Sequence, residues 1–169
     1  GTRFMRNSLR IAAVGAALAA ASFATSANAA ATATATATAE VLQTLTLTAD
    51  SALDFGQIAA NTGGTVTVNA NSTVSSTGTL ISTGTRAPAG FTVTGTPDAM
   101  VGVTLPSSAA TLSDGAGHSM TVDTWNSNPN GAFQLNATTG ASTFEVGGTL
   151  HVASGQTPGT YSGTFDVSV

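Results

Sequence analysis

Apolar and polar residues alternate along much of the chain after residue 40. In the last nine residues, 161–169, Tyr161, Phe165, Val167 and Val169 fall on one face of an extended chain, and Ser, Thr and Asp side chains fall on the other. A period of two residues is typical of a β-strand with one buried face. The same pattern predicts further strands at 65–68, 91–94, 101–105, 120–123 and 144–152.

Segments rich in Gly, Pro and Asn separate these predicted strands. They lie at 61–64, 86–90, 114–117, 126–131 and 157–159. Each proline sits at such a boundary, and no helical period is visible after residue 30. Short strands that recur about every 8–12 residues are typical of a β-sandwich or barrel. The sequence therefore predicts an all-β protein.

The first 29 residues have the three parts of a secretory signal peptide. Arg6 and Arg10 are basic, residues 11–24 carry no charge, and Ala27-Asn28-Ala29 is a small-x-small cleavage pattern. Met5 is a plausible start, so residues 1–4 are extra to the signal. The uncharged run is shorter than the roughly 20 residues that span a bilayer. We expect residues 1–29 to be removed and the mature chain to be secreted, with no membrane span.

The mature chain divides into an Ala/Thr-rich segment at 30–49 and a β-sandwich domain at 50–169. Residues 30–39 alternate Ala and Thr almost without exception, and residues 41–47 continue the phase with larger apolar residues. One interpretation is a flexible linker before an ordinary first strand. The other is an extended arm that pairs with a neighbouring molecule by strand addition.

Composition excludes several classes of protein. Only 7% of residues are charged, and the 169 residues include no Cys and no Lys. The lack of thiols excludes a disulfide scaffold and a Cys-ligated metal site. Without the leader, the chain has one Arg, Arg86, and eight acidic residues, so its formal charge is −7. Nucleic acids and anionic lipids are therefore not expected partners.

Four segments resemble a known family. They are Leu53-Asp54-Phe55-Gly56-Gln57-Ile58, Phe91-Thr92-Val93-Thr94-Gly95, Val146-Gly147-Gly148-Thr149-Leu150 and Pro158-Gly159-Thr160-Tyr161-Ser162-Gly163-Thr164-Phe165. In this order they resemble a secreted bacterial family known only as domain of unknown function 4402. More distantly, they resemble the spore coat U type domain, the subunit type of archaic chaperone–usher pili.

The resemblance implies an immunoglobulin-like β-sandwich that is secreted through the periplasm to the cell surface. In the pilus relatives the subunit lacks its last strand. A periplasmic chaperone fills the resulting groove first, and the N-terminal arm of the next subunit, placed by an outer-membrane usher, fills it later. On this chain the implied arm is about 31–47. Its inserting side chains are Val41, Leu45 and Leu47, and the groove is flanked by Tyr161, Phe165 and Val167.

Two features depart from that pattern. The archaic pilins carry a disulfide near the first strand, and this chain has no Cys. The Ala-Thr repeat also makes a weak donor strand, because an Ala methyl buries little apolar area.

Candidate catalytic chemistry is sparse. No Gly-x-Ser-x-Gly elbow, Walker loop or Gly-x-Gly-x-x-Gly motif is present. His118 and His151 lie in separate predicted strands, and no local spacing joins His151 to Asp123 or Glu145 in a triad. We expect no catalytic, cofactor or metal site, and a protein that is not an enzyme.

Trp125 is the only Trp, and it precedes the Asn126–Gly131 loop. An exposed Trp beside Asn126 would suit stacking on a sugar, whereas a buried one would close one end of the core. The sequence thus favours a non-enzymatic structural subunit, pilin- or coat-like, that self-associates on the cell surface by strand addition. The alternative is a monomeric surface or periplasmic module that binds a glycan or protein.

Overall fold

The computed structural model describes residues 30–169, and the predicted signal peptide lies outside them. The described residues contain only β-strands, which confirms the all-β class. The strands are β1 (Thr46–Ser51), β2 (Gln57–Ala59), β3 (Gly64–Val68), β4 (Val74–Ser76), β5 (Ile81–Thr83), β6 (Ala89–Thr94), β7 (Met100–Gly102), β8 (Ala110–Ser113), β9 (Ser119–Asn128), β10 (Ala132–Gln134) and β11 (Ala141–Val152). In residues 30–169 there is no helix that could cross a membrane.

Residues 40–169 form one compact unit. Residues 30–39 belong to a separate unit, in which the described part is exposed and lies in no strand. The first strand, β1, runs across the boundary expected at residue 49, so the last two residues of the predicted arm, Thr46 and Leu47, are part of the domain's own sheet.

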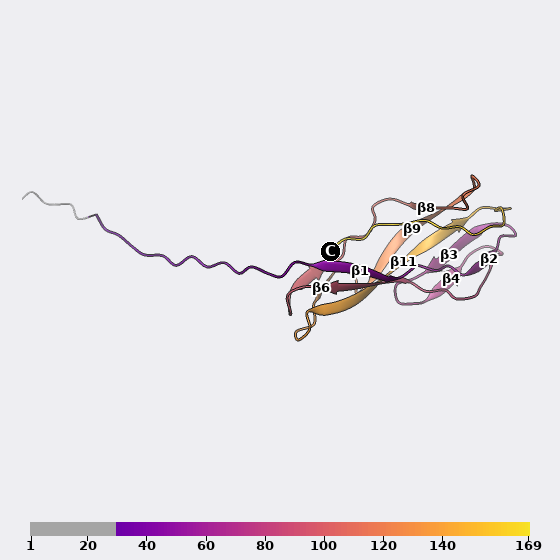
Figure 1. The fold of residues 1–169 in the computed structure, drawn as a ribbon. Coiled ribbons are helices and arrows are strands. Elements are labelled where there is room, and N and C mark those ends of the chain that lie inside the picture. The colour runs from indigo at the N-terminus through magenta and orange to yellow at the C-terminus, as the bar shows by residue number, and fades with distance from the viewer. Residues whose placement is uncertain (1–29) are drawn as a thin grey trace, which may run out of the picture. The chain divides into compact units, whose positions relative to one another are not determined.

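The main sheet has seven strands and is organised around β11 (Figure 1). One edge of β11 pairs with β9. The other edge pairs with β6 along Ala141–Val146 and with β3 along Gly148–Val152, so the sheet forks there. β1 extends the β6 branch, β4 extends the β3 branch, and β8 extends β9.

Gly147 lies at the fork between β6 and β3. A Cβ at this position would come 2.3 Å from the backbone oxygen of Val68 and 2.5 Å from the nitrogen of Ala70. Such a contact is far inside van der Waals distance, so the backbone of β3 can approach β11 only because residue 147 has no side chain.

The inward-facing residues of β11 join two hydrophobic clusters. Leu150 and Val152 belong to one cluster, with Phe55, Val66, Val68, Leu80 and Val122. Phe144 and Val146 belong to the other, with Ala89, Phe91, Val93, Val101 and Leu135. The two-stranded sheets β2–β5 and β7–β10 contribute Ile58, Val101 and Phe133 to these clusters and so cover the main sheet. The result is the sandwich-like fold that the sequence predicts.

The pattern of alternation located five of the eleven strands and overstated the length or regularity of two segments. The strands predicted at 65–68, 91–94, 120–123 and 144–152 fall within or overlap β3, β6, β9 and β11, whereas the strand at 101–105 ends at Gly102. The predicted terminal strand 161–169 is not a regular strand. It is an extended segment with two isolated bridges, Ser162 to Ser113 and Ser168 to Thr104. Its apolar face is nevertheless the predicted one, because Phe165, Val167 and Val169 pack against the second cluster.

Candidate functional site

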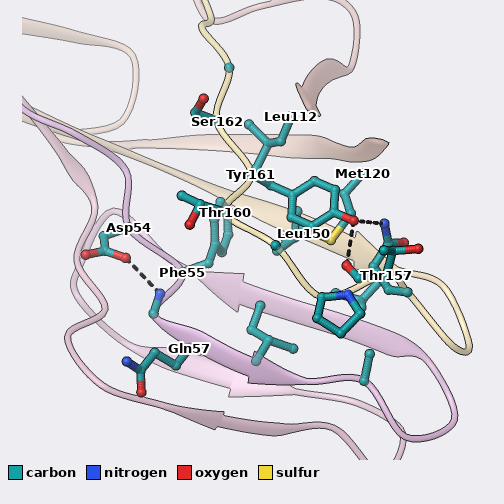
Figure 2. Close-up of a pocket in the computed structure, with 18 of the residues that line it drawn as sticks. Asp54, Phe55, Gln57, Leu112, Met120, Leu150, Thr157, Thr160, Tyr161 and Ser162 are labelled. Carbon is teal, nitrogen blue, oxygen red and sulfur yellow. Dashed lines mark hydrogen bonds between the residues drawn. The ribbon is translucent and has the colours of Figure 1, made fainter. Parts of the chain in front are cut away.

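A groove runs between the segment that follows β1 and the C-terminal segment. Its larger compartment has a volume of about 770 Å³ and lies between residues 52–60 and 156–163, with Leu112, Met120, Leu150 and Val152 among its lining residues (Figure 2). A smaller compartment, about 230 Å³, is lined by residues of 49–55 and 163–165 together with Trp125. The two compartments share Ala52, Leu53, Phe55, Leu112 and Gly163, so they lie next to each other.

We call residues 52–60 the N-flank of this groove. Its backbone is anchored on the side of Ala87, where Asp54 N donates to Ala87 O at 2.9 Å and Ala87 N donates to Asp54 O at 3.0 Å. The Asp54 carboxylate accepts a bond from Gly56 N at 2.8 Å, and Gly56 adopts φ +75°. This tight turn directs Phe55 into the core, where it is 7% exposed.

We call residues 156–163 the C-flank. The Tyr161 hydroxyl donates to Thr157 O at 2.7 Å and accepts from Gln156 Nε2 at 2.9 Å, which closes a loop on itself. Ser162 and Ser113 exchange two backbone bonds. A Cβ at Gly163 would come 2.1 Å from Thr111 O, so a residue with a side chain could not approach β8 this closely.

The two flanks share no backbone hydrogen bond within the described residues. On its far side the N-flank pairs through β2 with β5, and the C-flank bonds to Ser113. Between them lies an apolar floor, and Asp54 is the one charged residue among those lining the larger compartment. An uncharged, extended segment therefore suits this site chemically.

The predicted inserting residues have different positions. Val41 is 94% exposed and lies in no strand. Leu45 is 40% exposed, and its Cδ2 would be 2.7 Å from a Cβ on Gly95 of the same domain. Leu47 pairs with Val93 inside the molecule and packs against the second cluster. Leu47 therefore belongs to the domain's own sheet. Any part of the arm that is free to insert into another molecule must lie before β1.

The predicted flanking residues lie at or beside the groove. Tyr161 lines the larger compartment and Phe165 lines the smaller one. Val167 is half-buried against the second cluster, beyond the residues that line either compartment. In the sequence, the N-flank stood out only because residues 53–58 resemble a motif of the family. Its role as the opposite wall depends on long-range packing.

Trp125 and Asn126 lie in β9 and not in a loop. The Trp125 ring packs on Phe165, and its Nε1 donates to Ser108 O at 3.1 Å. Asn126 Oδ1 accepts from Ala70 N at 2.7 Å. Both side chains therefore have partners within the domain, in agreement with the interpretation that Trp125 closes the core.

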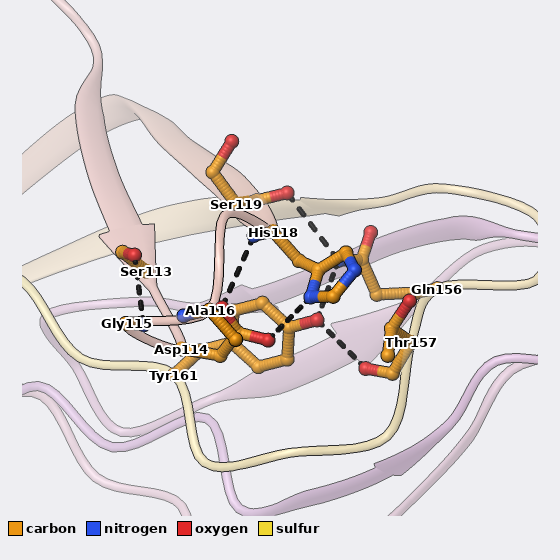
Figure 3. A network of polar contacts seen from close by, with 9 residues as sticks. All are labelled: Ser113, Asp114, Gly115, Ala116, His118, Ser119, Gln156, Thr157 and Tyr161. Carbon is orange, nitrogen blue, oxygen red and sulfur yellow. Dashed lines mark hydrogen bonds and ion pairs between the residues drawn. The ribbon is translucent and has the colours of Figure 1, made fainter.

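Two histidine–aspartate pairs lie on the surface. His118 Nδ1 is 2.6 Å from Asp114 Oδ2 next to the C-flank (Figure 3), and His151 Nε2 is 2.7 Å from Asp123 Oδ1. The pKa of Asp114 is lowered by the backbone N–H of Ala116 and then by His118. The pKa of Asp123 is lowered mainly by its bond to His151. Within residues 30–169 no serine hydroxyl bonds to either histidine, and no three metal-ligating side chains cluster.

A family model described as Domain of unknown function (DUF4402) matches residues 45–169. The chain belongs to this family. The match confirms the resemblance seen in the four sequence segments, and the DUF4402 domain begins one residue before β1. The more distant resemblance to the spore coat U type stays a prediction. No curated protein and no solved structure matches the chain.

Proposed function

We propose that this DUF4402 protein is a non-enzymatic structural subunit, pilin- or coat-like, that assembles on the cell surface by β-strand addition. The observation that carries the proposal is the groove between two flanks that share no backbone hydrogen bond, in a chain that also has an exposed, extended N-terminal segment. The predicted leader supports secretion, with a periplasmic chaperone and an outer-membrane usher as proposed partners.

The groove favours a strand as its occupant. Its walls are two backbone segments with no backbone hydrogen bonds to each other, and its floor is apolar. An added strand gains affinity from main-chain hydrogen bonds, and alternate side chains entering the floor determine its register. Unpaired strand edges are an aggregation hazard, so a specific partner strand also protects the subunit.

The N-terminal segment has the pattern such a strand needs. From residue 31 to residue 41 every odd position is Ala or Val, and the even positions are four Thr and one Glu. One face is therefore apolar and the other polar, and all of these residues are exposed. Val41 supplies the largest apolar area on that face. Burying a Val side chain contributes roughly 1.5–3 kcal/mol.

The proposal is tested by the state of the protein on the cell surface. The full chain is expressed with its leader in a host with two membranes, with and without a pilus chaperone. Surface protein is then run unheated and heated on a denaturing gel and imaged by negative stain. We expect an unheated ladder, which collapses to one band on boiling, together with thin fibres.

Deletion of residues 30–42 identifies the donor. The deletion stops before Gln43, whose N–H donates to Thr96 Oγ1 at 2.7 Å, and leaves β1 intact. We expect a folded domain without a ladder. Val41→Asp should weaken the ladder much more than Thr38→Asp, which places the same charge on the polar face. A ladder that survives the deletion contradicts the proposal.

A further inference from the structure

We infer that the turn between β8 and β9, residues 114–118, governs the position of the C-flank, and that Asp114 is the residue through which it does so. This inference rests on the strand-addition function proposed above, because the C-flank is one wall of the groove. It adds a positioning residue that lines neither compartment and so would not touch an inserted strand.

The Asp114 carboxylate organises this turn. Its Oδ1 accepts from Ala116 N at 2.8 Å and from His118 N at 3.1 Å, and its Oδ2 is 2.6 Å from His118 Nδ1 (Figure 3). The side chain is only 8% exposed, although it lies at the end of a hairpin. Gly115 and Gly117 adopt φ +75° and +98°, and glycine gives the chain little stiffness of its own. The shape of the turn therefore depends on the bonds that converge on this one carboxylate.

The C-flank lies directly against the same carboxylate. A Cβ at Gly159 would be 3.5 Å from Asp114 Cβ, 3.7 Å from Asp114 Oδ2 and 3.7 Å from Tyr161 Cε2. These are ordinary van der Waals distances, so only the width of a methyl group separates Gly159 from the carboxylate and from the Tyr161 ring. A turn that lost its shape would remove the surface on which Gly159 rests.

Hydrogen bonds join the C-flank to both ends of the turn. Just before the turn, Ser162 and Ser113 exchange backbone bonds of 3.0 and 2.8 Å. Just after it, Gln156 Nε2 donates to Ser119 O at 3.3 Å. The C-flank is therefore attached before, within and after the turn, and we expect it to follow any change in the shape of the turn.

The N-flank is held by a different part of the domain. It pairs with β5 through β2 and with Ala87 through Asp54, and no backbone hydrogen bond within residues 30–169 joins it to the turn. A change in the turn would therefore displace one wall of the groove and leave the other in place. Leu112 and Met120 pair with each other next to the turn and line the larger compartment, so part of the floor would move as well.

The second histidine–aspartate pair offers a matched comparison. His151 Nε2 lies 2.7 Å from Asp123 Oδ1, but the Asp123 side chain is 42% exposed. Neither residue of this pair lines the groove. Loss of the Asp123 carboxylate thus removes an interaction of the same kind without disturbing the C-flank.

Hydrogen exchange of the secreted full chain tests whether the turn holds the C-flank. Exchange at residues 156–163 is divided by exchange in β11, so that a general loss of stability does not by itself change the ratio. We expect Asp114→Ala to raise this ratio about tenfold, because the turn loses its charge-assisted bonds. Asp114→Asn should raise it less, because an amide oxygen can still accept from the Ala116 and His118 N–H groups. Asp123→Ala should leave it unchanged.

The unheated ladder described above tests whether the position of the C-flank matters for assembly. At equal amounts of surface protein, Asp114→Ala should lose most of its ladder, Asp114→Asn should keep part of it, and Asp123→Ala should keep all of it. If Asp114→Ala does not fold, the same two measurements compare Asp114→Asn with Asp123→Asn.

Equal exchange ratios in Asp114→Ala and Asp123→Ala overturn the inference. A raised ratio with an undiminished ladder also overturns it, because the C-flank would then move without consequence for the groove. If the unaltered chain forms no ladder, the strand-addition function fails. The exchange ratio then still decides whether the turn holds the C-flank.

Discussion

The Trp125 ring lies on the Phe165 ring, with their centroids 4.6 Å apart and their planes at 32°. This contact joins β9 of the main sheet to the C-terminal segment, which has only two isolated backbone bridges. Trp125 also packs against both hydrophobic clusters. The contact therefore helps to hold the C-terminal segment in its place.

We expect Trp125 to contribute to the stability of the domain rather than to the binding of a ligand. Trp125→Ala removes the ring contact with Phe165 and leaves a cavity between the clusters, so we expect a loss of about 3 kcal/mol in the free energy of unfolding. Trp125→Phe keeps part of the contact and should lose much less. Urea unfolding measures both. A stable Trp125→Ala variant that failed to bind a glycan would instead favour the ligand-loop alternative.

Trp125 faces the core because β9 contains a bulge. Between Asp123 and Asn126 the pairing with β11 shifts by one residue, and Thr124 adopts φ 52°. Without the bulge, the alternation that buries Val122 would point Thr124 into the core. The extra residue reverses the alternation, so Trp125 points inward instead. Gly148 of β11 leaves room for the ring, since a Cβ there would be 3.2 Å from Trp125 Cε3.

Side chains added at the glycines of β11 should therefore be costly. Gly147→Ala places a methyl 2.3 Å from Val68 O and forces β3 and β11 apart, with an expected loss of about 3 kcal/mol in the free energy of unfolding. Gly102→Ala is the matched strand control, because a Cβ there meets nothing within 4 Å. Thermal unfolding of both variants checks this, and similar midpoints would contradict the account of the fork.

The faces of the strands could be predicted because alternation is local. β3, β6 and β11 lie where period-two runs place them, and their apolar positions are buried. The bulge at Thr124 could not be predicted in this way. It depends on which residue of β11 each residue of β9 pairs with, and the sequence pattern contains no such register.

The C-terminal segment shows the same limit more clearly. Its apolar and polar residues alternate without interruption, yet it forms only two bridges, Ser162 to Ser113 and Ser168 to Thr104. Between these bridges the C-terminal segment advances six residues, whereas the opposite segment advances nine. The surplus residues cannot pair in register, and Pro106 among them has no N–H to donate. The resemblance implied a groove beside the C-terminal segment, but its opposite wall, residues 52–60, could not be predicted, because the segment that lies opposite depends on long-range packing.

The hydroxyl of Tyr161 should stabilise the C-flank modestly. Tyr161→Phe removes the bonds to Thr157 O and Gln156 Nε2 and keeps the ring, so we expect a loss of about 1 kcal/mol in the free energy of unfolding. Hydrogen exchange at residues 156–163 should rise more than exchange in β11. Unchanged exchange there would show that the loop is held without the hydroxyl.

Acid should destabilise the domain through Asp114 and Asp123. Both have pKa values below their ordinary value of 3.8, because Asp114 accepts backbone bonds and a bond from His118 and Asp123 accepts a bond from His151. A carboxylate whose pKa is lower in the folded state stabilises that state above the ordinary value. This contribution is lost as the pH falls below 3.8 through the lowered pKa.

Urea unfolding at a series of acidic pH values measures this loss. The double variant Asp114→Asn, Asp123→Asn should be less stable at neutral pH and should show a shallower fall in the free energy of unfolding below pH 3.8. Asp166→Asn is the control, because the Asp166 carboxylate makes no hydrogen bond or ion pair within residues 30–169. If the double variant and the control lose stability with the same slope in acid, the two aspartates are not the source of the pH dependence.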